Sequence, residues 1–272
     1  CESNREVARL DLTKLRADQR YHFVHRADLI SLLLASAREA GVQIRLLQQV
    51  TLIEDGERAK INFETGASVV SDLVIDAGGL HSKLRPVLNG EAAPFFTGQV
   101  AWRAVIPNTN ARVGDVQVHM APGRHIVSYP LRGGELLNIV AVQERALWAS
   151  EGWMHRDDPA NLRDAFTDAD PAVQAMLAQV TDVHVWGLFR HPVADQWHGE
   201  NCALLGDAAH PTLPVLAQGA KMALEDAWAL CMCLHGAAGI GEGLAASQRQ
   251  RKTRARKVIE AANGNAWRYH LR

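Results

Sequence analysis

The segment from Leu204 to Ala227 contains the residues whose types and spacing most directly suggest chemistry. A short apolar run ends in Gly206-Asp207, and a carboxylate at the carboxyl end of a strand can accept a sugar hydroxyl. After a proline-broken loop, a helix is expected to start at Ala217-Gln218-Gly219-Ala220, where free N–H groups and the helix dipole favour a negatively charged ligand. The alternative is an ordinary strand–loop–helix connection capped by Asp207.

This segment resembles the second flavin motif of the FAD-dependent aromatic hydroxylases, such as salicylate hydroxylase, 6-hydroxynicotinate monooxygenase and the ubiquinone-pathway hydroxylases. The resemblance implies that Gly206 and Asp207 hold the flavin ribityl chain. It also implies that Gly219 and Ala220 face the pyrimidine edge of the flavin and that Pro214 lies over the ring.

A second stretch resembles the same family at the start of an apolar-periodic segment. His25-Arg26 matches its H-R-x-x-L helix start, in which the arginine reaches the flavin pyrophosphate. A planar, permanently charged guanidinium suits that role. The alternative for Arg26 is a surface residue in the first turn of a helix.

The middle motif departs from the family pattern. Where the family reads G-A-D-G, this chain reads Asp76-Ala77-Gly78-Gly79, so Gly78 replaces the motif carboxylate. Asp76 lies two residues earlier on the same face of a strand, so it either substitutes for that carboxylate or has another role. Lys221 replaces a usual Asn, and it either favours the anionic reduced flavin or points into solvent.

The chain has no strand–G-x-G-x-x-G–helix unit of the kind that wraps an ADP pyrophosphate, and it begins at Cys1. The sequence is therefore interpreted as an N-terminally truncated hydroxylase that begins after its first βαβ unit. The other interpretation is a natural variant that lost this nucleotide cradle. We expect the 272-residue chain to bind FAD poorly and an added upstream unit to restore binding.

The elements that must position these residues follow from hydrophobic periodicity. Expected helices are 24–40, 161–180 with a break at Pro171, 217–234 and 244–269; expected strands are 42–47, 51–53, 59–63, 68–70, 72–77 and 202–206, with an antiparallel sheet over 100–144. The predicted fold class is α/β. It comprises a discontinuous FAD-binding domain, residues 1–90 and 193–272, which lacks its first βαβ unit, and an inserted antiparallel-sheet substrate domain, residues 91–192. The long C-terminal helices belong to the first of these domains.

The inserted sheet supplies the candidate catalytic residues, His125 and Tyr129. On a strand they point to one face, where one could accept the proton of a phenolic substrate and the other could orient it. The alternative is that both residues pack in or beside a core.

Composition excludes several classes of function. The chain has 29 basic and 30 acidic residues, with a pI near 6.9, which does not favour binding to nucleic acid or a membrane surface. The basic run 249–257 is either a nucleic-acid patch or a solvated helix face. No metal motif and no membrane-spanning run is present in the sequence. The four cysteines fit a reducing cytoplasm, and a homodimer is compatible with the sequence.

The resemblance implies that NAD(P)H reduces FAD, and that the reduced flavin captures O2 as a C4a-hydroperoxide and hydroxylates a small aromatic or phenolic substrate. Two alternatives remain open from the sequence: another flavin oxidoreductase on this scaffold, such as a halogenase or prenyl reductase, and a non-catalytic remnant that binds no FAD. A flavin absorbance spectrum of the purified protein discriminates the last of these.

Overall fold

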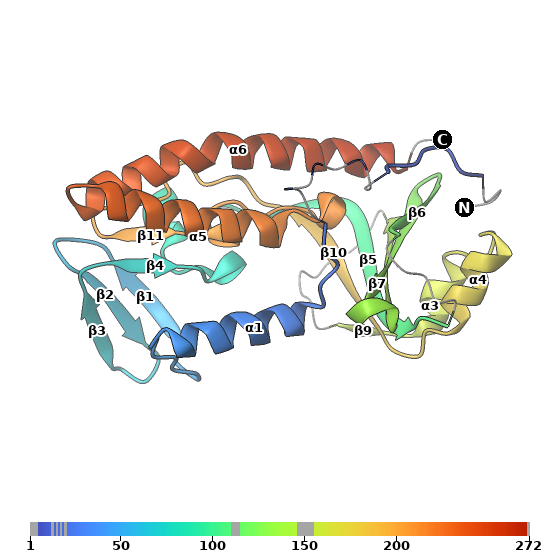
Figure 1. The fold of residues 1–272 in the computed structure, drawn as a ribbon, viewed down its shortest axis with the longest axis horizontal. Coiled ribbons are helices and arrows are strands. Elements are labelled where there is room, and N and C mark those ends of the chain that lie inside the picture. Colours follow the sequence, from blue (N-terminus) through green and yellow to red (C-terminus); the bar gives the residue numbers. More distant parts are fainter. Residues whose placement is uncertain are drawn as a thin grey trace. The chain divides into compact units, whose positions relative to one another are not determined.

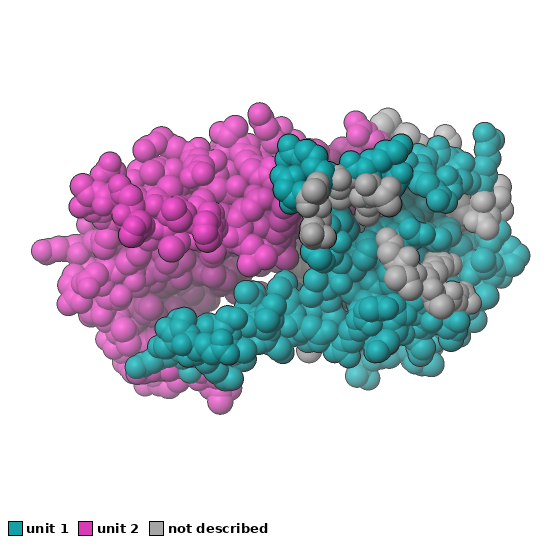
Figure 2. Space-filling view, viewed as in Figure 1, with its two compact units in different colours: residues 1–44, 97–188, 269–272 teal, residues 45–96, 189–268 magenta. Residues whose placement is uncertain are grey.

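The computed structural model describes residues 5–11, 14, 16, 18, 21–109, 115–145 and 155–270 (Figure 1). The chain divides into two compact units, coloured separately in Figure 2. Unit 1 comprises Cys1–Ile44, Thr97–Leu188 and Tyr269–Arg272, and unit 2 comprises Arg45–Phe96 and Phe189–Arg268.

Unit 1 is built on a six-stranded sheet. Its strands, in spatial order, are β6 (Gln117–Ala121), β7 (Arg124–Leu131), β8 (Leu136–Glu144), β5 (Phe95–Pro107), β10 (Val183–Arg190) and β9 (Arg156–Asp157). β6, β7, β8 and β5 pair antiparallel, which confirms the antiparallel sheet predicted over residues 100–144. Side chains alternate between faces along each strand, so one face can be apolar while the other carries polar residues.

The apolar face of this sheet packs with the helices α3 (Pro159–Asp164) and α4 (Pro171–Ala178). Their shared core includes Trp102, Ile126, Ile139 and Phe166. Each helix starts with an aspartate N-cap whose side chain accepts a backbone N–H of the first turn. A proline follows the cap, where the missing N–H of proline breaks no hydrogen bond of the helix. The proline at 171 therefore begins α4.

Helix α1 (Arg26–Glu39) belongs to unit 1 and has no buried residue. It ends before Gly41, whose φ of +79° suits glycine. Asp28 accepts two hydrogen bonds from Arg132, at 2.9 and 2.8 Å, in the short helix η3 (Arg132–Gly134). Residues 1–44 thus group with the sheet, whereas the predicted FAD-binding domain includes them. The assignment of cofactor and substrate domains stays a prediction.

Unit 2 contains an antiparallel sheet, a parallel strand pair and helices. The sheet is β1 (Val50–Glu54), β2 (Ala59–Phe63) and β3 (Ser68–Ser71), and the parallel pair is β4 (Val74–Asp76) and β11 (Cys202–Leu204). The helices are α2 (Arg85–Asn89), α5 (Gly219–Gly236) and α6 (Ile240–Arg268), with the short turns η2 (Gly79–His81), η4 (Gly206–Ala208) and η5 (Pro214–Leu216). α6 follows α5 after residues 237–239 and lies along it (Figure 1).

The predicted fold class is confirmed: the chain is mixed α/β with antiparallel sheets and long C-terminal helices. The predicted strand 42–47 is wrong, because these residues form no strand and Leu47 has a φ of +58°. Within the part of the chain that the structure describes, no helix combines the length and apolar character needed to cross a membrane. Among these residues there is also no group of three or more His, Cys, Asp or Glu side chains arranged to hold a metal ion.

Candidate functional site

The parallel pairing of β4 with β11 brings two distant sequence motifs together in unit 2. Cys202 pairs with Val74 and Leu204 with Asp76, so the carboxyl ends of both strands meet at one edge. Such an edge is where α/β sheets bind ligands. A Cβ atom built on Gly79 would lie 3.9 Å from the Cβ atom of Asp207. The loops after β4 and β11 therefore face one another across this edge.

The turn that carries Asp207 is held on several sides. Its first residue, Gly206, accepts hydrogen bonds on its carbonyl from the backbone N–H groups of Ala209 and His210, both at 2.9 Å. Nη1 of Arg85 donates to the carbonyl of Ala208 at 2.9 Å. The turn is consequently closed by its own backbone and braced from α2.

Gly206 is required at this turn for two separate reasons. Its φ is +60°, and a Cβ atom there would lie 3.0 Å from the Cβ atom of Ala223 on α5. Gly66, in the turn between β2 and β3, shares the positive φ (+83°) but faces open space. Comparing the two positions separates backbone strain from steric contact.

We expect Gly206→Ala to lower the free energy of unfolding more than Gly66→Ala does. The backbone penalty common to both is about 1–2 kcal/mol, and the contact with Ala223 should add about 1–3 kcal/mol of overpacking. Urea unfolding of both variants measures this difference. Equal losses would show that α5 yields to the added methyl group and does not constrain the turn.

The start of α5 lies in the same unit. Ala217 adopts the left-handed conformation with φ of +51°, and the N-cap residue Gln218 makes no side-chain capping bond to the described residues. The N–H groups of the first turn, from Gly219 onward, thus receive no side-chain cap from Gln218. Pro214, half-buried, begins η5 just before this helix. Lys221 is 62% exposed and lies 3.9 Å from Glu225, which fits the solvent-facing alternative.

The carboxylate of Asp76 accepts hydrogen bonds from the loop that follows it. Its Oδ1 atom accepts the backbone N–H of Gly78 at 2.7 Å, and its Oδ2 atom accepts the hydroxyl of Ser82 at 2.7 Å and the N–H of Leu84 at 2.9 Å. A Cβ atom on residue 78 would lie 2.8 Å from Oδ1 of Asp76, so glycine is needed there. The two departures from the motif, Asp76 and Gly78, therefore depend on each other, because the Asp76 carboxylate fills the space that a side chain at position 78 would need. This geometry favours the alternative in which Asp76 stabilises the loop.

The polar face of the unit 1 sheet carries Tyr129. Its half-buried ring stacks on Phe23 with ring centroids 5.7 Å apart, and Arg103 and Asn138 lie on the same face through the pairing of β7, β8 and β5. Nε of Arg103 and Nδ2 of Asn138 are buried and have no hydrogen-bond partner among the described residues. Burial raises the pKa of Tyr129, and the positive charge of Arg103 opposes that rise. This face thus presents a phenol beside two unsatisfied donor groups.

His125 shares that face with Tyr129 but belongs to a separate buried cluster. It is 3% exposed, and its Nδ1 atom lies 2.6 Å from Nε2 of His270, whose Nδ1 atom lies 2.8 Å from Oε1 of Glu144. Burial, together with the smaller effect of the neighbouring His270, lowers the pKa of His125 to about 3. These contacts agree with the packing alternative, while the catalytic role of His125 stays a prediction.

The chain matches the FAD binding domain family over residues 2–262. It is 34% identical over 260 residues to 3-amino-4-hydroxybenzoate 2-monooxygenase of Streptomyces cremeus, covering 92% of this chain and 63% of that protein. It is 31% identical over 280 residues to 6-hydroxynicotinate 3-monooxygenase of Bordetella bronchiseptica, covering 98% of this chain and 72% of that protein. The chain belongs to the FAD-dependent aromatic monooxygenases.

The fold of this monooxygenase chain is similar to that of a solved salicylate hydroxylase in complex with its substrate. The TM-score is 0.78 at 26% identity, covering 90% of this chain and 66% of that one. The chain spans about two thirds of the length of the relatives it matches. The predicted family and its cofactor, FAD, are thereby confirmed.

The residues of unit 2 fit FAD on two observations. Gly79 leaves the loop after β4 free of a side chain where that loop faces Asp207 in the loop after β11. The uncapped start of α5 offers backbone donors to an electron-rich ring edge. Arg26, by contrast, lies in unit 1, where its exposed side chain begins α1. Its pyrophosphate role stays a prediction.

Sequence reasoning missed the side chains that brace these turns. Ser82 and Arg85 follow the middle motif in the sequence, but their partners, Asp76 and the carbonyl of Ala208, appear only in the folded chain. The basic run 249–257 is likewise engaged within unit 2. Arg251 and Arg254 contact acidic residues of α5, and Lys252 and Arg256 contact Asp195.

The buried state of His125 predicts a specific pH dependence of stability. The unfolded chain binds a proton at this position below about pH 6.5, whereas the folded chain does so only near pH 3. The stabilisation that comes from burying the neutral His125 is thus fully present above the unfolded pKa. It is lost as the pH falls from the unfolded pKa towards the folded pKa. Between pH 7 and pH 5, we expect His125→Phe to reduce the slope of the free energy of unfolding against pH by up to about 1.4 kcal/mol per pH unit. Urea unfolding at several pH values measures this slope. An unchanged slope would show that His125 titrates normally.

The same variant tests the catalytic prediction for His125. If His125 acts on the substrate, hydroxylation by folded His125→Phe falls and hydrogen peroxide release rises. If it only packs, the overall stability falls and the ratio of product to NAD(P)H consumed stays at the wild-type value.

Proposed function

We propose that this chain supports NAD(P)H- and O2-dependent hydroxylation of a small aromatic substrate by FAD. The observation that carries the proposal is the placement of Asp207, after β11, in the same unit as the uncapped start of α5. The likeness to aromatic monooxygenases over 92–98% of the chain supports it.

Each half of the unit 2 site would hold a different part of the cofactor. The carboxylate of Asp207 would accept hydrogen bonds from the ribityl hydroxyl groups. The N–H groups at Gly219 and Ala220 would face the pyrimidine edge, where the helix dipole favours negative charge, and Pro214 would lie against the ring. When bound, reduced FAD supplies the activation of O2, with one oxygen atom going to the substrate and the other to water.

The polar face of unit 1 favours an aromatic substrate that carries oxygen acceptors. Its available groups are donors: the phenol of Tyr129, whose pKa is raised by burial, Nε of Arg103 and Nδ2 of Asn138. Unsatisfied buried donors are costly, so a ligand with a phenolate or carboxylate group would be stabilised there. The positive charge of Arg103 would also favour the ionised, electron-rich form of a phenol.

The substrate class can be chosen from the relatives. They are named for a hydroxylated aminobenzoate and a hydroxynicotinate, and the solved neighbour is named for salicylate; each compound combines an aromatic ring with hydroxyl and carboxylate groups. We propose such a hydroxylated aromatic acid as the substrate of this monooxygenase.

The test has two stages. FAD is titrated into the protein and binding is followed by the change in flavin fluorescence and absorbance. NADH and NADPH are then supplied in turn with each of the three aromatic acids, and hydroxylated product and hydrogen peroxide are both quantified. Substrate-dependent formation of product supports the proposal. Flavin reduction without product from any of the three aromatic acids would assign another flavin oxidoreductase activity. Absence of FAD binding both in this chain and after addition of an upstream nucleotide-binding unit would indicate a non-catalytic remnant.

A further inference from the structure

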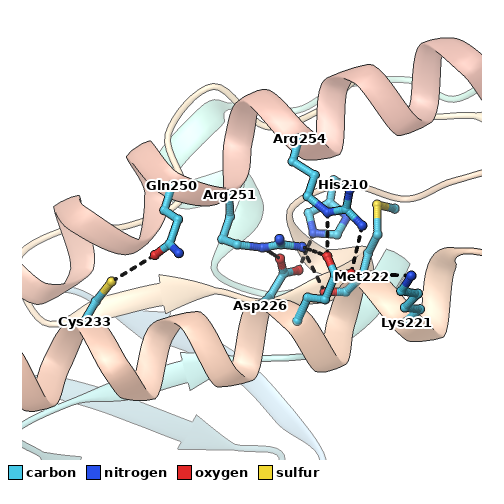
Figure 3. A network of polar contacts seen from close by, with 9 residues as sticks. His210, Lys221, Met222, Asp226, Cys233, Gln250, Arg251 and Arg254 are labelled. Carbon is cyan, nitrogen blue, oxygen red and sulfur yellow. Dashed lines mark hydrogen bonds and ion pairs between the residues drawn. The ribbon is translucent and has the colours of Figure 1, made fainter. Parts of the chain in front are cut away.

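A buried polar cluster lies immediately beyond the turn that carries Asp207. The next residue after the turn and Ala209 is His210, whose side chain is 1% exposed. Its Nε2 atom lies 2.5 Å from Oδ2 of Asp226 on α5 (Figure 3). A carboxylate only accepts hydrogen bonds, so the imidazole donates from Nε2. This contact joins the loop after β11 to α5.

Helix α6 holds Asp226 in place from the opposite side. Nε of Arg251 donates to Oδ1 of Asp226 at 2.7 Å, and Nη2 of Arg251 lies 2.9 Å from Oε2 of Glu225. Arg254 then donates to both carboxylate oxygens of Glu225, at 2.6 and 2.8 Å. Two guanidinium groups thus face two carboxylates (Figure 3). Asp226 cannot turn away from His210 without losing its buried partner Arg251, which would be strongly unfavourable.

Packing alone does not account for histidine at position 210. Its ring packs against that of Trp197 with centroids 5.0 Å apart, a contact that a phenylalanine ring could also make. Its Nδ1 atom is buried without a hydrogen-bond partner among the described residues, so its polarity is costly there. The hydrogen bond to Asp226 is the contact that specifically requires the imidazole.

The cluster connects the two halves of the flavin site. Ala223 of α5 packs against Gly206, at the start of the turn, and Asp226 of α5 binds His210, just after it. These two residues are three apart and therefore lie on one face of the helix. The same helix begins at Gly219, so α5 carries both the pyrimidine-facing start and the anchors of the turn.

We propose that His210 is a positioning residue of the flavin site. Its hydrogen bond to Asp226 sets the Gly206–Ala208 turn against α5 and so fixes the carboxylate of Asp207 relative to the start of that helix. The proposal rests on the proposed function, because it assumes that FAD binds at this turn.

The experiment compares two replacements of His210. His210→Phe keeps an aromatic ring beside Trp197 and removes the donor, whereas His210→Gln places an amide donor near the position of Nε2. FAD affinity is measured by titration below the unfolding temperature of each variant. We expect His210→Phe to weaken FAD binding by up to about tenfold, because the lost hydrogen bond to a charged group no longer holds the turn in its binding geometry. We expect His210→Gln to recover most of that loss and the wild-type visible circular dichroism of bound FAD.

Two further measurements make the outcome decisive. In an Asp226→Asn background, His210→Phe should add less than twofold to the loss, because the two residues act through one bond. His198→Phe, a half-buried histidine of the same unit that contacts the carbonyl of Gly199 at 2.8 Å, should keep the wild-type affinity. If His210→Phe does not fold, His210→Asn, which is too short to place a donor at Nε2, is compared with His210→Gln.

The proposal is overturned if His210→Phe binds FAD as tightly as wild type, or if the Phe and Gln variants lose the same affinity in proportion to their loss of thermal stability. Asp207→Ala identifies which idea has failed. If Asp207→Ala weakens binding and His210→Phe does not, only the positioning role is wrong. If neither variant weakens binding, the flavin site itself has been misplaced.

Discussion

Asp207→Ala should weaken FAD binding at least about tenfold, the loss expected for a charge-assisted hydrogen bond. Asp207 lies in the turn after β11, where Gly206, Arg85 and the backbone of residues 209 and 210 hold its position. Because this turn is closed by backbone contacts, removing the carboxylate should leave the fold intact. The dissociation constant of FAD, measured by fluorescence titration alongside thermal unfolding, tests both statements.

A matched control separates the position of the charge from its presence. Asp72 is a carboxylate of the same unit near β4, but its side chain is 81% exposed and pairs with Arg58 at the surface. Asp72→Ala should therefore keep the wild-type affinity for FAD. Asp207→Asn should give an intermediate loss, since an amide oxygen still accepts a hydrogen bond without the charge. Wild-type FAD affinity in Asp207→Ala would remove the ribityl-binding role.

Tyr129→Phe should slow hydroxylation at least about tenfold and increase hydrogen peroxide release per NAD(P)H oxidised. The variant removes the hydroxyl group that we propose orients the substrate oxygen, and groups that position or transfer a proton typically contribute about 10²–10⁴-fold. The stacking on Phe23 should persist, so stability should change little. Product and peroxide are measured together in the FAD-loaded enzyme, with FAD affinity as an independent readout.

The chain offers a close control for this substitution. Tyr269, a half-buried tyrosine of the same unit, lies beside His125 with ring centroids 5.1 Å apart, and burial raises the pKa of its phenol as well. Tyr269→Phe should leave the ratio of product to peroxide unchanged. Equal uncoupling in both variants would show that loss of a buried hydroxyl group disturbs the sheet generally, and a fully coupled Tyr129→Phe would exclude Tyr129 from substrate orientation.

The sequence by itself determined the local parts of this protein. The short apolar run before Gly206 predicts β11, and the apolar residues at helical spacing after Gly219 predict α5. Both follow from the spacing of apolar residues over a short segment of the chain. The alternation around residue 127 likewise places His125 and Tyr129 on one face of β7. Motif resemblance added the family and its cofactor, which the comparisons confirm.

Only the tertiary structure decided the partners of these residues. Asp76 could be interpreted from the sequence as a replacement for the motif carboxylate, but its oxygens accept from Gly78, Ser82 and Leu84. His125 meets His270, and His210 meets Asp226, across separations that no local period encodes. The physical reason is that strand and helix periods fix which way a side chain points, whereas the packing of distant elements fixes what it reaches. Burial and the neighbouring His270, which lower the pKa of His125, and the burial that raises the pKa of Tyr129 arise only at that second level.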